Sequence, residues 1–268
     1  MKLIFLGTGT SVGVPSIGCQ CRVCRSNDPH DKRLRCSALV ETDETRILID
    51  VGPDFRQQIL QQEFRKIDAV LATHIHYDHV AGIDDLRPFC AIKPIEVYAN
   101  RSTFDALHQT MPYCFGEHLY PGVPLLNLNV IEKHQQIVVG DLEIVPIEVM
   151  HGKLPILAFI VNQIADGITF MQRNNRPQLV YITDMKTISD EEIPYIDNVE
   201  TLVVNGLRFA SLHHSHQTAE EAQLFAKRVN ARQTYLTHMG HDIGLHKDSF
   251  FRLDNGVELA YDNLRIEI

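Results

Sequence analysis

Residues 73–79 read Thr-His-Ile-His-Tyr-Asp-His and follow directly on residues 68–72, an apolar run that predicts a strand. In an extended segment the side chains of His74 and His76 project to the same side, so both imidazoles can reach one cation. Asp78 and His79, at the start of a predicted helix, can reach a second ion nearby. Imidazole and carboxylate are ligands that suit divalent zinc, manganese and iron. One short motif therefore supplies half of a predicted two-metal site.

Short apolar or alternating runs recur along the whole chain and predict strands. They lie at 3–6, 38–41, 46–49, 69–72, 96–99, 142–149, 156–161, 179–183, 201–204, 233–237 and 264–268. Helical patterns lie at 54–62, 78–91, 102–110 and 218–229, the last with Thr218 and Glu221 as a capping box. Residues 112–124 and 164–177 predict loops. The strands outnumber the helices and come in clusters, which predicts an α/β (α+β) fold with helices outside a pair of sheets, and not a Rossmann sheet or a β/α barrel. No repeat or linker is visible, so residues 1–268 are expected to form a single domain.

The composition excludes several classes of protein. The 268 residues carry 25 Lys and Arg against 34 Asp and Glu, a formal charge of -9, which argues against a sequence-independent binder of duplex nucleic acid. The N-terminus has one cation and a short apolar run broken by glycines, which is not the pattern of a signal peptide. No run approaches the ~20 apolar residues of a membrane span, and no lipid-anchor tail is present. We therefore expect a cytoplasmic protein with no membrane partner.

The motif at 74–79 matches, letter for letter, the H-x-H-x-D-H hallmark of the metallo-β-lactamase superfamily, which this chain resembles. The resemblance implies a four-layer αβ/βα sandwich and three further ligands downstream. Candidates stand in the right order, each just after a predicted strand: His151, Asp184 and His238. By this resemblance one ion would be held by His74, His76 and His151, the other by Asp78, His79 and His238, with Asp184 bridging. Asp50, at a strand end, would support the motif through hydrogen bonds without binding metal.

The resemblance implies two divalent active-site ions, zinc or manganese. Such a pair lowers the pKa of a water between the ions and neutralises charge on an attacked phosphoryl or acyl group. Hydrolysis near neutral pH is the expected chemistry. The fold alone does not name the reaction, because thioesterases, lactamases, nucleases and phosphodiesterases share this kind of site.

Three of the six cysteines crowd into residues 19–24, Cys-Gln-Cys-Arg-Val-Cys, which points to metal and not to disulfides. This run, with residues 6–15 (Leu-Gly-Thr-Gly-Thr-Ser-Val-Gly-Val-Pro) and 49–56, resembles the PhnP group of cyclic-phosphate phosphodiesterases, relatives of tRNase Z, over nearly the whole chain. In that group a structural zinc is completed by a histidine three residues after the last active-site histidine. The resemblance therefore implies a zinc held by Cys19, Cys21, Cys24 and His241, with no position left open. The alternative is three loop thiols that are merely reduced.

His216 lies 22 residues before His238 and just ahead of the helix predicted from Thr218. In the PhnP group and in tRNase Z a histidine at this place contacts the scissile phosphate and can protonate the leaving oxygen, a role that suits the near-neutral pKa of imidazole. We expect His216 and Asp78 to act in catalysis. The adjacent His213 and His214 are expected to be solvated.

The leading interpretation is a dinuclear metal phosphodiesterase that hydrolyses a small or cyclic phosphodiester, for which 5-phosphoribosyl 1,2-cyclic phosphate is one candidate. One alternative is tRNA 3' endonuclease activity, although the sequence has no Gly/Pro/Lys-rich insertion between His151 and Asp184 or beside His216 to hold a tRNA. Nucleic acid is a partner only under this alternative. A second is a non-catalytic relative such as PqqB, disfavoured because every ligand position is filled. Thioesterase or lactamase chemistry is disfavoured by His216 and the thiolates. The resemblance also implies a homodimer.

Overall fold

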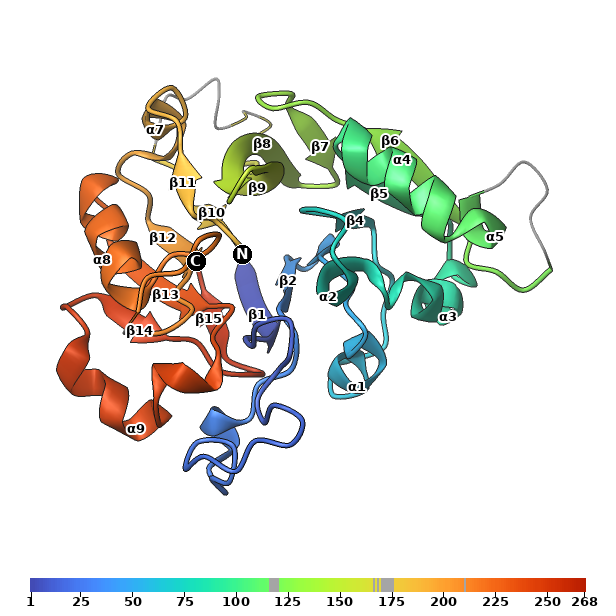
Figure 1. Ribbon diagram of the computed structural model, residues 1–268. Helices are drawn as coiled ribbons and strands as arrows, with labels where there is room; N and C mark the ends of the chain where they lie inside the picture. Colours follow the sequence, from blue (N-terminus) through green and yellow to red (C-terminus); the bar gives the residue numbers. More distant parts are fainter. Residues whose placement is uncertain (116–120, 166, 168, 170–175, 210) are drawn as a thin grey trace.

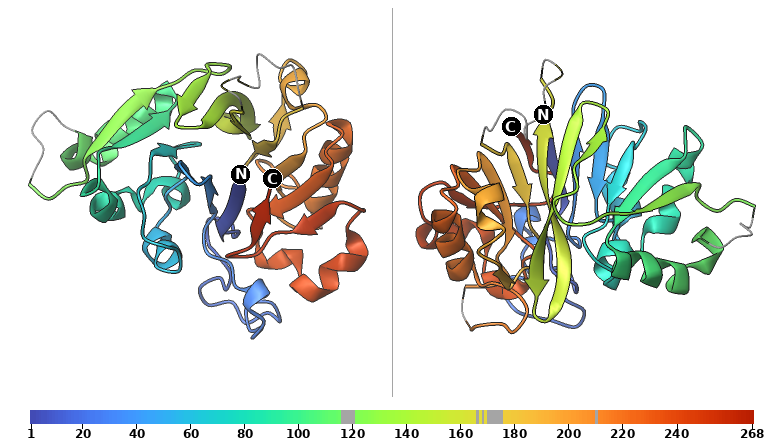
Figure 2. Two further views of the ribbon diagram at one scale, coloured as in Figure 1. Left: turned by 180° about the vertical axis from the view of Figure 1, so that it is seen from behind. Right: turned by 90° about the horizontal axis from the view of Figure 1, so that it is seen from above.

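A computed structural model describes residues 1–115, 121–165, 167, 169, 176–209 and 211–268. Two β-sheets pack face to face, and helices cover the outer surface of each sheet (Figures 1 and 2). The predicted four-layer sandwich is confirmed.

The first sheet is built from the N-terminal half of the chain and its last strand. Its order is β15-β1-β2-β3-β4-β5-β6, and β3 to β6 run parallel. The strands are β1 (Lys2–Gly7), β2 (Ser37–Glu41), β3 (Arg46–Ile49), β4 (Ala69–Leu71), β5 (Ile95–Ala99), β6 (Leu126–Val130) and β15 (Arg265–Glu267). Because β15 pairs with β1, the two ends of the described chain lie in one sheet (Figure 1).

The second sheet has the order β11-β8-β9-β10-β12-β13-β14, with β7 paired to β8. Its strands are β7 (Ile137–Val139), β8 (Leu142–His151), β9 (Leu154–Gln163), β10 (Leu179–Tyr181), β11 (Thr187–Ile188), β12 (Thr201–Asn205), β13 (Gln233–Thr237) and β14 (Val257–Leu259). A long antiparallel hairpin, β8 with β9, is followed by parallel strands β10, β12 and β13.

The layers follow from strands that are apolar on both faces, because each sheet is covered on two sides. In β1, Leu3 and Phe5 belong to the core between the sheets, whereas Ile4 and Leu6 pack in the core beneath the outer helices. Phe159 and Tyr181 supply the other side of the inter-sheet core. A third cluster lies between the second sheet and its helices.

The helices are short. They are α1 (Phe55–Ile59), α2 (Tyr77–Val80), α3 (Arg87–Cys90), α4 (Arg101–Thr110), α5 (Pro112–Phe115), α7 (Ile193–Ile196), α8 (Ala219–Arg228) and α9 (His246–Ser249). The described residues also form the 3₁₀ turns η1 (Pro29–Asp31), η2 (Ile83–Leu86), η3 (His241–Ile243) and η4 (Phe250–Arg252). Thr218 and Glu221 form the predicted capping box of α8. Within the described residues, no helix combines the length and apolar character needed to cross a membrane.

The helix predicted over 78–91 was wrong as a single element, because α2, η2 and α3 divide it. The break begins at Gly82, whose N–H donates to the carbonyl of Val51 at 2.8 Å instead of continuing α2. A side chain on Gly82 would meet the carbonyl oxygen of Gly52 at 2.1 Å, so only glycine permits this contact. Pro88 is the second residue of α3, in the first turn where a missing N–H costs no hydrogen bond. The contact seats the metal-motif turn against the end of β3.

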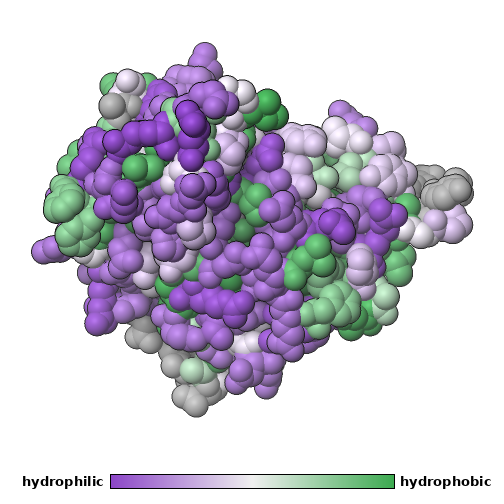
Figure 3. Space-filling view, turned by 90° about the horizontal axis from the view of Figure 1, so that it is seen from below, coloured by the Kyte–Doolittle hydropathy of each residue, from purple (hydrophilic) through white to green (hydrophobic). Residues whose placement is uncertain are grey.

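The predicted loop at 112–124 contains the short helix α5, and residues 116–120 within it lie outside the described part of the chain. Much of the predicted loop at 164–177 also lies outside it. Strands β6, β7, β11 and β14 were not predicted. The face of the molecule drawn in Figure 3 is mostly hydrophilic, with hydrophobic residues in small separate groups.

The parallel strands bring the candidate ligands together. Asp50 follows β3, His74 follows β4, Asp184 follows β10 and His238 follows β13. Because the carboxyl ends of parallel strands meet at one edge of a sheet, residues far apart in the sequence converge between the two sheets. His151 ends β8 at the same place.

Candidate metal centre

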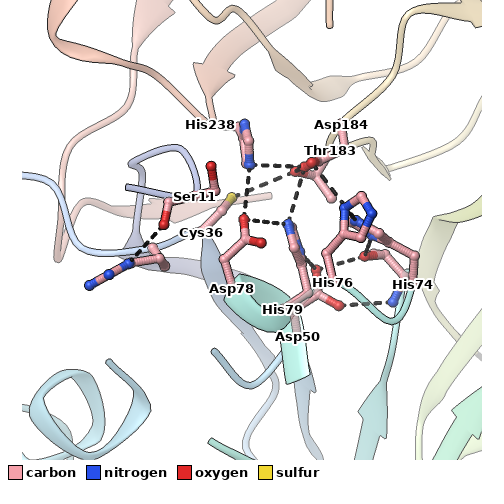
Figure 4. Close-up of polar contacts among 12 residues, drawn as sticks. Ser11, Cys36, Asp50, His74, His76, Asp78, His79, Thr183, Asp184 and His238 are labelled. Atoms are coloured by element: carbon pink, nitrogen blue, oxygen red, sulfur yellow. Dashed lines mark hydrogen bonds and ion pairs between the residues drawn. The ribbon is translucent and has the colours of Figure 1, made fainter. Parts of the chain in front are cut away.

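Seven predicted active-site ligands converge in two groups that share Asp184. Figure 4 labels all of these ligands except His151. The first group contains His74, His76, His151 and Asp184, and the second contains Asp78, His79, Asp184 and His238. Within each group one ligand atom from each residue lies within 4.8 Å of all the others. The second group is buried, whereas the first includes the exposed His76. The first group is therefore the more open to solvent.

The carboxylate of Asp184 faces both groups with different oxygens. Its Oδ1 lies 3.3 Å from Nε2 of His79 and 3.1 Å from Nε2 of His238. Its Oδ2 lies 3.9 Å from Nε2 of His74. This is the arrangement that a carboxylate bridging two cations requires.

Hydrogen bonds fix the tautomers of three histidines. Nδ1 of His79 donates to Asp50 Oδ2 at 2.6 Å, and Nδ1 of His151 donates to the carbonyl of Ser215 at 2.9 Å. The Thr73 hydroxyl donates to Asp50 at 2.9 Å, so it accepts from Nδ1 of His74 at 3.0 Å. Each Nε2 is left with its lone pair, the form that binds metal.

The donor set fits divalent cations. Nε2 of His79 and Nε2 of His238 are buried and have no hydrogen-bond partner among the described residues. Both atoms face carboxylate oxygens, with His79 Nε2 also 3.1 Å from Asp78 Oδ2. Buried lone pairs and negative oxygens pointed at one another are costly unless a positive charge lies between them. The residues therefore suit metal ions.

The electrostatics of the site act differently on the different ligands. Burial lowers the pKa of His74 well below its usual value, which keeps the imidazole neutral. Burial opposes the ionisation of Asp184, but His238 and His79 hold its pKa well below its usual range. For His79 burial opposes protonation, yet the carboxylates of Asp184 and Asp50 raise its pKa well above the usual value. A metal ion must replace that proton, so its affinity falls as the pH falls.

Three residues of the site adopt left-handed backbone conformations: Asp50 (φ 59°), Asp184 (φ 55°) and His238 (φ 54°). Residues other than glycine adopt positive φ infrequently, and such conformations persist where the surrounding contacts impose them. Asp50 and His238 stand directly after β3 and β13, and Asp184 stands three residues after the end of β10. The turn at each strand end directs the side chain toward the shared site.

Asp50 supports the motif from the end of β3. Its Oδ1 accepts from the backbone N–H of Thr73 at 2.8 Å, and its Oδ2 accepts from the Thr73 hydroxyl and from His79. The same carboxylate thus fixes the loop that begins the motif and the tautomer of a ligand. Thr73 was not singled out from the sequence, although its place directly before His74 was a usable signal.

Replacement of Asp50 by Asn should weaken metal binding roughly 10- to 100-fold, the usual cost of losing a partner that orients a ligand. Asn tolerates the left-handed backbone but cannot accept from three donors with its single oxygen. Bound metal is measured after dialysis against graded chelator, with Asp43→Asn, an exposed acid in the β2–β3 turn, as the control. Equal metal retention in the two variants would contradict this role.

The thiol group lies apart from the active-site groups. Nδ1 of His241 lies 3.2 Å from Sγ of Cys19, 3.4 Å from Sγ of Cys21 and 3.4 Å from Sγ of Cys24. Ligand atoms around a tetrahedral zinc with three thiolates and an imidazole are about 3.5 Å apart. The Cys24 N–H points at Cys21 and lowers the pKa of that thiol to about 6. All six cysteines of the chain are free thiols.

The thiol group is joined to the active site through the backbone after β13. Met239, next to ligand His238, donates from its N–H to the carbonyl of Thr8 at 2.9 Å and accepts from the N–H of Thr10 at 3.0 Å. A side chain on Gly9 would meet the carbonyl oxygen of Arg33 at 2.7 Å. The glycine thus permits close packing between backbones.

His216 lies beside both groups without belonging to either. Its ring centroid is 4.7 Å from that of His151 and 4.9 Å from that of His238, and its Nδ1 is 4.0 Å from Asp184 Oδ2. Burial, and next the neighbouring His238, lower the pKa of His216 to about 3. Its Nδ1 is buried without a partner. His213 is half-buried with its ring 5.0 Å from that of His216, and His214 is exposed.

Residues 45–239 match the beta-lactamase superfamily domain. The chain is also similar to the solved structure of a new diphosphatase from the PhnP family, with a TM-score of 0.86 and 33% identity over 100% of this chain and 97% of that one. It is 26% identical to ribonuclease Z of Bradyrhizobium diazoefficiens over 88% of this chain and 89% of that protein.

The chain is 42% identical, over 98% of its residues, to octanoyltransferase of Porphyromonas gingivalis. This match covers 51% of the octanoyltransferase, so the chain spans about half the length of that relative. The remaining half of the relative has no counterpart in the match.

Proposed function

The chain belongs to the metallo-β-lactamase superfamily, and we propose that it is a metal-dependent hydrolase of the PhnP group that cleaves a small or cyclic phosphodiester with two divalent ions. The observation that carries the proposal is the placement of Asp184 between two ligand groups with His216 beside them. A shared carboxylate suits a metal pair, and an imidazole outside both groups suits contact with substrate.

The carboxylate and imidazole ligands would have different roles in the reaction. When bound, a divalent pair supplies an acidic water nucleophile and neutralises charge on the phosphoryl oxygens. Asp184 and Asp78 compensate the positive charge of the ions, while the neutral nitrogens of His74 and His151 complete the first group. We expect the diester to enter beside the exposed His76, since the second group is buried.

His216 is placed to bind the scissile phosphate and to donate a proton to the leaving oxygen. Its lowered pKa makes the free imidazole neutral near pH 7, and an anionic diester beside it raises that pKa. In this role the ring would take up a proton from solvent as the substrate binds and donate that proton to the departing alkoxide oxygen. Its position just before α8, which the Thr218 capping box fixes, holds the ring near the groups.

Replacement of His216 by Ala should lower the rate on an alkyl diester by roughly 100-fold, the loss typical of a missing general acid. A nitrophenyl diester should suffer less, because its leaving group departs with little protonation. Rate constants for both substrates are compared on samples whose metal content is counted, with His214→Ala as the exposed control. Metal loss would make His216 a ligand, and equal rate losses would make it a positioning group.

The proposed function is tested with a substrate panel. Bis(p-nitrophenyl) phosphate and cyclic ribose phosphates, including 5-phosphoribosyl 1,2-cyclic phosphate, should be hydrolysed by the metal-loaded protein. A precursor tRNA and an acyl thioester are tested as substrates of the alternative activities. Preferential cleavage of the tRNA would favour the endonuclease alternative that the ribonuclease Z similarity raises. Thioester hydrolysis without diester hydrolysis would overturn the proposal.

A purely binding role, as in a PqqB-like protein, is less well supported. The two ligand groups are complete in the structure, and His216 lies next to them. A protein that only binds metal needs no unpartnered imidazole at that place. Absence of hydrolysis across the whole panel, in protein shown to hold its metal ions, would favour this alternative.

A further inference from the structure

Three predicted ligands are each preceded by a threonine: Thr73 before His74, Thr183 before Asp184 and Thr237 before His238. All three threonines are completely buried. Thr73 is held by Asp50, as described above. The hydroxyl groups of Thr183 and Thr237 instead approach one sulfur atom.

That sulfur belongs to Cys36, which lies directly before β2 in the first sheet. Its Sγ is 3.3 Å from the Thr237 hydroxyl, 3.3 Å from the Tyr181 hydroxyl and 3.9 Å from the Thr183 hydroxyl. Tyr181 is in β10 and Thr237 in β13, so the contacts join the two sheets. We call these four residues, Cys36, Tyr181, Thr183 and Thr237, the hydroxyl–thiol network.

The network reaches the metal centre through Thr183. Its hydroxyl donates to Asp184 Oδ1 at 2.7 Å, the oxygen that faces His79 and His238 (Figure 4). A hydroxyl that contacts both a thiol and a carboxylate oxygen has little freedom to rotate. Thr237 is bonded directly to His238 in the chain, so the thiol supports the turns that present two ligands.

Asn205, at the end of β12, secures the backbone on the other side of Asp184. Its Oδ1 accepts from the N–H of Met185 at 2.8 Å, and its Nδ2 donates to the carbonyl of Met185 at 3.0 Å. The left-handed Asp184 is thus fixed between the Thr183 hydroxyl and a two-bond amide clamp. Both anchors are buried.

The fold by itself has no need of polar groups at this place. Cys36 and Tyr181 belong to the apolar core between the sheets, where hydrocarbon side chains would pack without polar atoms to satisfy. Cys90 offers a contrast, because its buried thiol meets only the carbonyl of Leu125, at 3.4 Å, among the contacts of the described residues. The Cys36 thiol therefore contacts three hydroxyl groups near the metal ligands, whereas the contact of the Cys90 thiol is with one backbone carbonyl.

We propose that Cys36 is a positioning residue, whose thiol fixes the Asp184 carboxylate and the turn before His238 in the orientation that holds the second metal ion. The role goes beyond the proposed function, because it concerns metal binding and is independent of which substrate is cleaved. It acts through Thr183 and Thr237, and not by contact with the ions.

The test compares Cys36→Ala with Cys90→Ala, which removes the same atoms from another buried site. Zinc-loaded proteins are dialysed against graded concentrations of a chelator, and the metal retained per chain is counted. The chelator concentration that removes half of the active-site metal should fall about 10-fold in Cys36→Ala, in line with other lost supports of metal ligands. Cys90→Ala should match the unsubstituted chain, and the metal-free forms of both variants should lose similar thermal stability.

Cys36→Ser separates positioning from packing. Its hydroxyl can donate and accept like the thiol, so metal retention should lie between Cys36→Ala and the unsubstituted chain. If Cys36→Ala fails to fold, Thr183→Val serves instead, with Thr234→Val, a buried threonine earlier in β13, as its control. Cys36→Ala or Thr183→Val that retains metal as well as its control would overturn the proposal. Failure of the diester panel would leave this result unaffected, because hydrolysis is not measured.

Discussion

Replacement of Asp184 by Asn should lower diester hydrolysis by on the order of 100- to 1,000-fold, the range seen when one preorganised electrostatic partner of a reaction is lost. The change is confined to charge. Asn adopts the left-handed backbone that Asp184 requires, with φ of 55°, and its amide oxygen can still accept from the Thr183 hydroxyl. A neutral amide, however, cannot present two negative oxygens to the two ligand groups.

The measurement pairs the rate constant with a metal count on the same sample. Asp190→Asn is a suitable control, because that carboxylate is exposed and belongs to neither ligand group. Among the described residues its ion-pair contact is with Arg228. We expect the control to hydrolyse the diester normally. Near-normal turnover of Asp184→Asn with two ions still bound would show that Asp184 is not the bridge.

Sequence periodicity predicted the positions that matter for this argument. The runs before His74 and Asp184 are apolar on both faces, which is typical of strands buried between helices and a second sheet. The run before His238, Gln-Thr-Tyr-Leu-Thr, is instead rich in β-branched and aromatic residues, which favour strands. The ligand set could be predicted because the H-x-H-x-D-H motif carries the resemblance to the superfamily, and the further candidates His151, Asp184 and His238 each stand just after a predicted strand. Strand β6, Leu-Asn-Leu-Asn-Val, alternates apolar and polar residues and could have been predicted from that signal. Strand β14 has three residues, too few to show a period.

Other properties of the site depend on contacts that the sequence does not display. Cys36 meets Tyr181 and Thr237 across 145 and 201 residues of chain, and no local spacing connects them. The lowered pKa of His216 likewise arises from burial beside His238. The sequence predicted an imidazole near the phosphate, whereas the protonation of that imidazole follows from its packing.

Replacement of Cys21 by Ser should remove about one zinc per chain and lower the thermal stability, because the binding energy of a structural zinc is part of the free energy of folding. Cys21 is exposed, so the substitution takes no packing from the core. A loss of stability must then come from the metal. We expect Tm to fall by roughly 5 °C or more, since about 1 kcal/mol shifts Tm by about 2–4 °C in a chain of this size.

Gln20→Ser provides the matched control, because Gln20 is an exposed neighbour in the same loop and lies outside the thiol group. It should keep its zinc and its Tm. Strong chelation should lower the Tm of the control toward that of Cys21→Ser, while Cys21→Ser itself should lose only what the active-site ions contribute. His241 stands three residues after His238, and Met239 is bonded to the N-terminal loop, so metal loss at the thiols should also reduce hydrolysis. Unchanged zinc content and Tm in Cys21→Ser would instead show that Cys19, Cys21 and Cys24 are reduced loop thiols. The N-terminal loop would then be joined to the active site by the backbone hydrogen bonds of Thr8 and Thr10 with Met239.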